Sequence, residues 1–194
     1  MPRTPEQYEE IRETRRKLIM ETALELFATK GYHGTSINDI AMKAEISKGL
    51  LYNYFSGKEE LVIEIMKNGF LEFLELFDPN HDGVITKAEM RNVLSAIFKT
   101  VKEKAHFWRL YFAVITQPIV NQVAFAEIME IAMPVLNMLS RYFDSEGYEN
   151  PPAEARIFAA MMDGLTLSYV YDTENFPVDD VIKRVKDMYN LNDK

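Results

Sequence analysis

The chain has 194 residues, no cysteine and a formal net charge of −8. A chain of this length can bury a sizeable core as one or two domains, and without cysteine it can form neither disulfides nor thiolate metal sites. The amino terminus lacks the apolar segment of a signal peptide, and no apolar run approaches membrane-spanning length. These features predict a soluble cytoplasmic protein without a membrane partner.

The negative charge is concentrated in the second part of the chain. Residues 1–60 contain nine Lys and Arg against ten Asp and Glu, whereas residues 61–194 contain 13 against 20. Binding to DNA phosphates needs local cations rather than a basic total. Cations that could serve are found in the first 60 residues, at Arg3, Arg12, Arg15, Arg16, Lys17, Lys48 and Lys58.

The first predicted helix begins at the sequence Thr4-Pro5-Glu6-Gln7. Thr4 can cap the helix, proline is favoured at the first helical position, and Gln7 can bond back to the cap. The helical pattern continues to about Thr29, and Gly31 is a typical helix stop.

Two short helices joined by a tight turn are predicted next, within residues 35–61. In the first, Thr35 or Ser36 can act as the cap, with Asp39 three residues after Ser36. Its core-facing residues recur at helical spacing and are Ile37, Ile40, Ala41 and Ala44. Both helices are too short to be stable alone, so tertiary packing must hold them.

The second short helix should begin near Ser47 and present polar and aromatic side chains to solvent. Its inward residues are Ile46, Leu50, Leu51 and Phe55, and its exposed residues are Lys48, Tyr52, Asn53 and Tyr54. This is the way in which a helix-turn-helix offers a helix to the DNA major groove. A lysine at this place can reach guanine acceptors, whereas tyrosine and threonine hydroxyls can bind phosphates.

A fourth helix is predicted over about 58–77, with Ser56 and Glu59 as a capping-box pair. Lys58 stands beside the start of this helix, where a phosphate is favoured by the helix dipole and the open amide groups.

These residues resemble the TetR family of bacterial transcriptional regulators over about residues 13–65. The resemblance is carried by Ala23–Tyr32, Thr35-Ser36-Ile37, Ile40-Ala41, Ser47-Lys48-Gly49, Leu51–Phe55 and Lys58–Leu61. It implies that Lys48 and Gly49 lie against base edges. It implies phosphate contacts for most of the other DNA-binding candidates, which together are Thr35, Ser36, Ser47, Tyr52, Asn53, Tyr54 and Lys58. The alternative is that the tyrosines only cover the helix pair and that Asn53 is a solvated surface residue.

A second motif follows the fourth helix, because residues 78–89 match every fixed position of an EF-hand calcium loop. The predicted oxygen ligands are Asp78, Asn80, Asp82, the carbonyl of Val84, Thr86 directly or through water, and Glu89. EF-hands generally occur in pairs, however, and only one such loop is present. The alternative is a polar turn in which Asp78 or Thr86 caps a helix.

The remaining chain is predicted to be helical, over about 87–104, 106–117, 121–145, 152–172 and 178–190. It is rich in Met and aromatic residues, which suit apolar ligands but are also ordinary core residues of a helical bundle. The pocket candidates are Phe107, Trp108, Tyr111, Phe112, Met129, Met133, Phe158 and Met162.

The sequence therefore predicts an all-α protein with a DNA-binding domain at 1–57 and a ligand-binding and dimerisation domain at 58–194. We expect a regulator, a repressor released by a small apolar or amphipathic effector. It should bind double-stranded DNA at an inverted repeat as a homodimer, because one short helix reads only a half-site. The resemblance implies that the last two long helices, about 153–173 and 178–190, form the dimer interface.

The alternative is an all-helical enzyme or carrier with a hydrophobic pocket and no DNA role. No nucleophile motif, phosphate-binding glycine loop or acid–base pair supports catalysis. Histidines at 33, 81 and 106 show no zinc-ligand spacing. Calcium is the single cofactor that the residues suggest.

Overall fold

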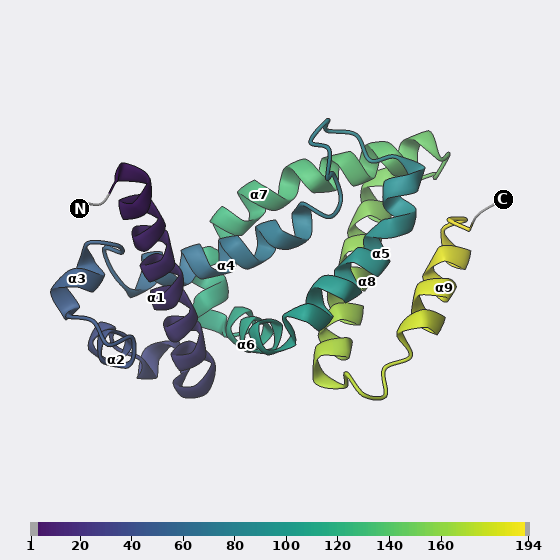
Figure 1. Cartoon of the computed structure of the whole chain (residues 1–194). Coiled ribbons are helices and arrows are strands. Elements are labelled where there is room, and N and C mark those ends of the chain that lie inside the picture. Colours follow the sequence, from purple (N-terminus) through teal and green to yellow (C-terminus); the bar gives the residue numbers. More distant parts are fainter. Residues whose placement is uncertain (1–3, 193–194) are drawn as a thin grey trace. The chain divides into compact units, whose positions relative to one another are not determined.

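The computed structural model describes residues 4–192, and the regular elements of this part of the chain are all helices, without a strand (Figure 1). The helices are α1 (Pro5–Gly34), α2 (Ile37–Lys43), α3 (Lys48–Tyr52), α4 (Lys58–Leu74), α5 (Lys87–Glu103), α6 (Ala105–Ile115), α7 (Pro118–Ser145), α8 (Pro151–Tyr171) and α9 (Val178–Met188). The all-α prediction is confirmed, and the helices expected from residue 58 onward are each found within a few residues of their predicted bounds.

The described chain packs as two compact units. The head unit contains residues 4–68 and 110–127, and the body unit contains residues 69–109 and 128–192. Helices α4, α6 and α7 contribute residues to both units. The predicted functional boundary after residue 57 stays a prediction, because this division reports packing alone.

In the head unit, capping residues set where the first three helices begin. Thr4 caps α1 with Gln7 bonding back to it, and Ser36 caps α2 with Asp39, as the sequence predicts. Helix α1 is regular up to Gly31, whose φ of 75° breaks the helix before a last turn. A left-handed φ favours glycine, because a Cβ would crowd the backbone.

The core of the head unit is formed by the apolar faces of these helices. Its fully buried side chains, each 2% exposed or less, include Ile19, Leu24, Phe27, Ile40, Leu51, Phe55, Leu61 and Ile65. Because α2 and α3 are only seven and five residues long, this burial rather than helix propensity holds them in place.

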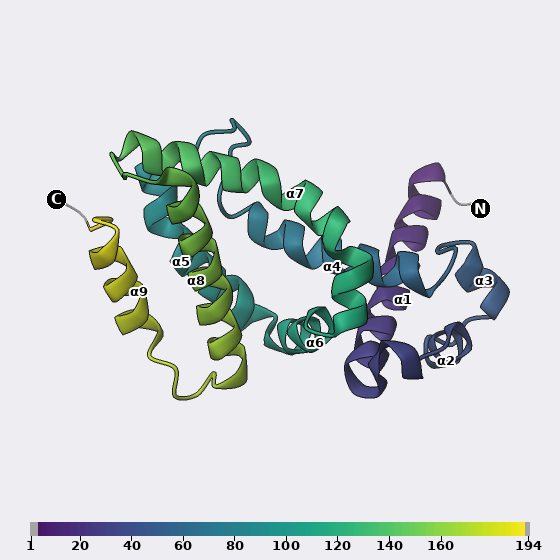
Figure 2. The same cartoon turned by 180° about the vertical axis from the view of Figure 1, so that it is seen from behind.

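The body unit is built on the amphipathic helix α5, which packs against α8 and α9 (Figures 1 and 2). Its buried stripe consists of Met90, Val93, Leu94, Ile97, Phe98 and Val101. Aromatic rings fill the centre of this unit: Phe143 lies 5.9 Å from Phe158, and Phe158 lies 5.2 Å from Tyr189, between ring centroids.

Helix α7 corrects one expectation. By length and composition it is apolar enough to cross a membrane, with a mean hydropathy of 1.5 in its most apolar window, of which 22% is buried. The prediction that no apolar run approaches this length is therefore wrong. One such helix is weak support for a membrane protein, because core helices of soluble proteins meet the same criterion.

Candidate DNA-binding site

The turn between α1 and α2 is fixed by a reciprocal cap. The Ser36 amide donates to the Asp39 carboxylate at 2.9 Å, and the Asp39 amide donates to the Ser36 hydroxyl at 3.1 Å. The Ser36 hydroxyl also donates to Asp39, at 2.6 Å, and these bonds lower the pKa of the Asp39 carboxyl. Ser36 thus orients α2, while its hydroxyl is engaged within the protein.

Helix α3 begins as predicted, with the Leu50 amide donating to the Ser47 hydroxyl at 3.1 Å. Leu51 is completely buried beneath it. On the opposite face, Lys48 is exposed and Tyr52 is 48% exposed, with the Lys48 ammonium 5.9 Å from the Tyr52 ring centroid. The helix therefore presents a cation and a phenol hydroxyl, the two groups needed to contact a base edge and a phosphate.

The other α3 candidates have different surroundings. Gly49 and Asn53 are exposed, and Tyr54 is half-buried. A side chain at Gly49 would meet no other group within 4 Å, so the backbone is open to approach at this point. The exposed polar face predicted for α3 is therefore present.

Thr35, which is predicted to contact DNA, is buried in the protein. The residue is 1% exposed, and its hydroxyl donates to the carbonyls of Leu26 at 3.1 Å and Gly31 at 2.9 Å. The Thr35 hydroxyl is therefore not available to a phosphate in this conformation. It instead stabilises the carboxyl end of α1.

Lys58 is similarly engaged. Its ammonium donates to the carbonyls of Tyr32 at 2.7 Å and Thr35 at 2.9 Å, and it lies 4.3 Å from the Tyr32 ring centroid. Desolvation lowers the pKa of the Lys58 ammonium. The sequence predicts that Lys58 binds a phosphate. In this conformation its ammonium instead bonds the carbonyls at the carboxyl end of α1, where a cation is favoured.

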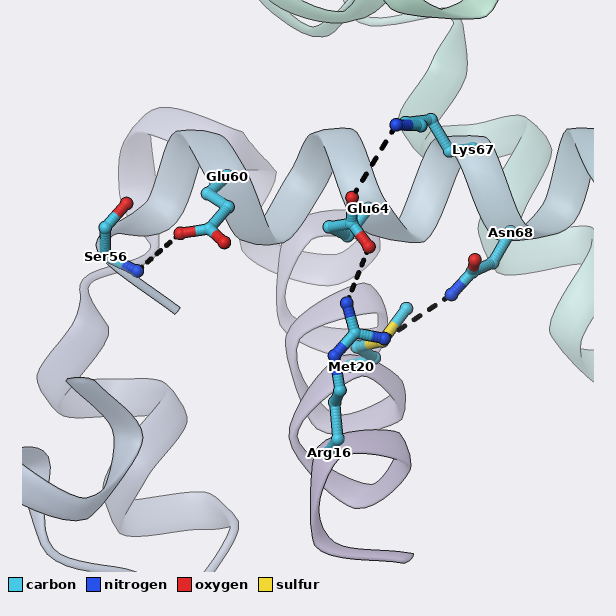
Figure 3. A network of polar contacts seen from close by, with 7 residues as sticks. All are labelled: Arg16, Met20, Ser56, Glu60, Glu64, Lys67 and Asn68. Atoms are coloured by element: carbon cyan, nitrogen blue, oxygen red, sulfur yellow. Dashed lines mark hydrogen bonds and ion pairs between the residues drawn. The ribbon is translucent and has the colours of Figure 1, made fainter. Parts of the chain in front are cut away.

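A polar network ties α1 to α4 within the head unit (Figure 3). The Arg16 guanidinium lies 2.6 Å from the Glu64 carboxylate, which is also 3.8 Å from the Lys67 ammonium. Arg16 also lies over the Phe55 ring at 5.2 Å. Arg16 is thus a cross-link between helices in this conformation, although the sequence offered it as a cation for phosphates.

The cap of α4 differs from the prediction. The Ser56 amide donates to the carboxylate of Glu60 at 2.6 Å, rather than to that of Glu59 (Figure 3). Hydrogen bonding to the side chain of Ser56 and then to its amide lowers the pKa of the Glu60 carboxyl. The two glutamates are neighbours, and the direction of the chain entering α4 selects the one that faces the Ser56 amide.

The calcium-like loop is ordered by its own side chains. Asp78 accepts from the Gly83 amide at 2.9 Å, Asn80 from the Asp82 amide at 3.1 Å, and Asp82 from the Val84 amide at 2.8 Å. The carboxylate of Glu89, however, accepts from the amide and hydroxyl of Thr86, both at 2.7 Å, and caps α5.

The loop carboxylates do not converge on a metal position. Within residues 4–192, no group of three or more His, Asp or Glu side chains is placed to hold a metal ion. In this conformation the loop is the polar turn that the sequence left open as the alternative, with Thr86 as the helix cap.

The pocket candidates divide between the two units. Tyr111 and Phe112 belong to the head unit, where the Tyr111 hydroxyl donates to the Met66 carbonyl at 2.9 Å. In the body unit, Trp108 is completely buried and stacks on Phe73 with centroids 4.1 Å apart. The other body-unit candidates range from buried to exposed: Phe158 and Met162 are buried, Phe107 and Met129 are half-buried, and Met133 is 40% exposed.

Comparisons with known proteins agree with this geometry. Residues 19–65 match the model of the family described as bacterial regulatory proteins, tetR family. Over 92 residues the chain is 36% identical to the Bacillus subtilis protein named uncharacterized HTH-type transcriptional regulator YuxN, covering 47% of this chain and 32% of that protein. Over 127 residues it is 28% identical to the Staphylococcus epidermidis biofilm operon negative regulator IcaR, covering 65% and 68%.

The fold is similar to that of solved regulators. The structure of FadR from Bacillus subtilis in complex with stearoyl-CoA matches with a TM-score of 0.66 and 21% identity, over 89% of this chain and 96% of that one. This likeness shows the fold. The chain matches about a third of the length of YuxN.

Proposed function

We propose that the chain is a sequence-specific DNA-binding transcriptional regulator that acts as a repressor. The observation that carries the proposal is the exposed polar face of α3, with Lys48 and Tyr52 above a buried Leu51. The match of residues 19–65 to the tetR-family model supports it, as do the matched proteins, which are described as transcriptional regulators rather than enzymes.

Selection from a library of random DNA duplexes tests the proposal. Purified protein should enrich an inverted repeat, and log K for this duplex should fall steeply with log salt concentration, because phosphate contacts release counterions. A purified protein that enriches no sequence, with weak or salt-independent DNA affinity, would favour the enzyme or carrier alternative.

A homodimer is the second part of the proposal. One side of α8 carries small or apolar residues that are not buried within the chain: Ile157, Ala160, Met161, Gly164, Leu165 and Ser168. Ile157 is 56% exposed, and a side chain at Gly164 would meet nothing within 4 Å. Such a face allows two helices to approach closely, and a two-fold dimer supplies two copies of α3 for two half-sites. Sedimentation that gives a monomer at micromolar concentration contradicts this.

The proposed effector is a small apolar or amphipathic molecule bound in the Met- and aromatic-rich body. The FadR structure holds stearoyl-CoA in a similar fold, which supports an acyl-CoA as the first compound to test. Stearoyl-CoA should raise the melting temperature and release the selected duplex. An effector acts only through different affinities for the DNA-binding and released states, so thermal stabilisation without release rejects that compound as inducer.

Calcium binding by the 78–89 loop is proposed as a stabilising feature. Asp78, Asn80 and Asp82 already bond main-chain amides of the loop, which supports a turn that could be completed by a cation. Glu89 would have to leave its bonds to Thr86 in order to bind the ion. Calorimetric titration with calcium should give heat that Glu89→Gln abolishes. No heat and no rise in melting temperature at millimolar calcium reduce the motif to a turn.

A further inference from the structure

The break in α1 at Gly31 is held by a glutamine that lies far away in the sequence. Gln117, between α6 and α7, accepts through Oε1 from the Tyr32 amide at 2.9 Å. Its Nε2 donates to the Phe27 carbonyl at 2.9 Å and the Ala113 carbonyl at 3.2 Å. One amide side chain therefore binds main-chain groups on both sides of the break, using its donor and its acceptor together.

Two further side chains form hydrogen bonds with the same turn of α1. Lys58 donates to the Tyr32 carbonyl, and Thr35 donates to the Gly31 carbonyl. Tyr32 is thus held at its amide by Gln117 and at its carbonyl by Lys58, and it is 8% exposed. Buried main-chain groups that lose such partners are costly, so the break keeps this form only while its partners are in place.

We infer that Gln117 is a positioning residue for the DNA-binding helices: it fixes the direction in which the chain leaves α1 toward α2 and α3. The inference rests on the proposed function. Thr35, whose hydroxyl bonds the end of α1, follows Tyr32 by three residues, and α2 begins at Ile37. A change of direction at Tyr32 therefore displaces the start of α2 directly.

Gln117 stands in the short link between α6 and α7, and it lies in the head unit together with its main-chain partners. The helices before and after it, α6 and α7, each contribute residues to both units. Displacement of either helix would carry Gln117 away from Phe27 and Tyr32. We expect such a displacement to alter the direction in which the chain enters α2 and α3.

Hydrogen exchange on the full-length protein provides a test that does not depend on DNA. Gln117→Met keeps the side-chain length without the amide. Thr116→Val is the matched control, because Thr116 is the exposed neighbour and its hydroxyl donates to the nearby Phe112 carbonyl in α6. In Gln117→Met, exchange should accelerate at least tenfold at Tyr32 and also through residues 36–53. Acceleration confined to Tyr32, or equal acceleration in Thr116→Val, overturns the inference.

Operator affinity provides the second test, with the duplex selected by the wild-type protein. Gln117→Met should weaken binding about tenfold, which corresponds to about 1.4 kcal/mol. The slope of log K against log salt should stay unchanged, because the phosphate contacts themselves are retained. Wild-type affinity in this variant overturns the inference.

Gln117→Glu separates hydrogen bonding from space filling. Glutamate has nearly the same shape and can still accept from the Tyr32 amide, but its carboxylate cannot donate to the Phe27 carbonyl. We expect Gln117→Glu to lose operator affinity and the exchange protection of residues 36–53, while the Tyr32 amide keeps an acceptor. Wild-type behaviour of Gln117→Glu would overturn the part of the inference that rests on donation to the Phe27 carbonyl.

One further measurement, together with the exchange data, distinguishes a loss of folding from a loss of function. Circular dichroism establishes that each variant is helical. If Gln117→Met does not fold, hydrogen exchange is measured on Gln117→Glu instead. If the wild-type protein selects no DNA, the proposed function fails, while the exchange data still decide whether Gln117 fixes α2 and α3.

Discussion

Both units have an apolar core and polar side chains that bond distant main-chain groups, but the body unit adds a cluster of packed aromatic rings at its centre. Gln117, Lys58 and Tyr111 each reach a main-chain group at least 26 residues away. In the body unit Arg91 and Arg141 likewise donate to the distant Leu191 and Gly83 carbonyls, at 2.8 and 2.9 Å. The body unit differs in its distant ring pairs, such as Phe98 with Tyr169 at 5.4 Å between centroids.

This difference suits the two proposed tasks. Hydrogen bonds to fixed main-chain groups depend strongly on direction, so they can hold a short helix such as α3 in one orientation. Aromatic and methionine packing is less directional and can adapt to an apolar ligand. The comparison predicts that substitutions in the body change stability, and that substitutions on α3 change DNA preference.

The largest expected effect is the loss of stability in Phe143→Ala. Phe143 is completely buried and contacts four aromatic rings, so truncation should cost about 3–5 kcal/mol. Urea unfolding measures this cost. Phe125→Ala is the control, because Phe125 is 55% exposed and its loss should change stability by less than about 0.5 kcal/mol. Equal midpoints for the two variants would contradict the aromatic core of the body.

Dimerisation gives the next largest effect. Gly164→Leu should be tolerated within the monomer, since a Cβ at this position meets nothing within 4 Å. Against a second copy of α8 the larger side chain should weaken association about 100-fold, or by about 2.7 kcal/mol. Sedimentation measures the shift to monomer, with Gly164→Ala as the milder control. A dimer of unchanged affinity would place the interface elsewhere.

Lys48→Ala tests whether α3 reads bases. The loss should be about 1–3 kcal/mol on the selected operator and smaller on unrelated duplexes, because a base contact contributes to sequence preference. Binding titrations at one salt concentration measure both affinities. Equal losses on operator and unrelated DNA would assign Lys48 to phosphate contact.

Gly31→Ala tests the break in α1. A Cβ at the left-handed φ of 75° should cost about 1–2 kcal/mol in thermal or urea unfolding. Gly57→Ala serves as the control, because a Cβ at Gly57 meets nothing within 4 Å and its φ is not left-handed. Unchanged stability in Gly31→Ala would mean that the break relaxes freely.

The features predicted from the sequence are those whose partners are close along the chain. Thr4 and Gln7, and Ser36 and Asp39, are three residues apart, so their caps follow from local spacing. The exposed face of α3 likewise follows from helical periodicity. The cap of α4 was assigned to Glu59 instead of Glu60 because both are near enough, and only the path of the chain decides between them.

The roles of Thr35, Lys58 and Gln117 could not be predicted in this way. Their partners include the Leu26, Phe27 and Tyr32 carbonyls, and main-chain carbonyls leave no signal in a sequence. Gln117 has the additional difficulty that 85 residues separate it from Tyr32. The pocket residues could not be assigned from the sequence for a different reason: Met and aromatic side chains suit either a ligand pocket or an ordinary core.

The composition of the head unit also has a consequence for synthesis on the ribosome. Residues 4–68 emerge first, but the unit is completed only by residues 110–127, which include Tyr111 and Gln117. At translation rates of about 5–20 residues per second, several seconds pass before these partners are made. During that interval the Tyr32 amide and the Met66 carbonyl lack their native partners, so the nascent DNA-binding helices should stay loosely packed until α7 has begun to form.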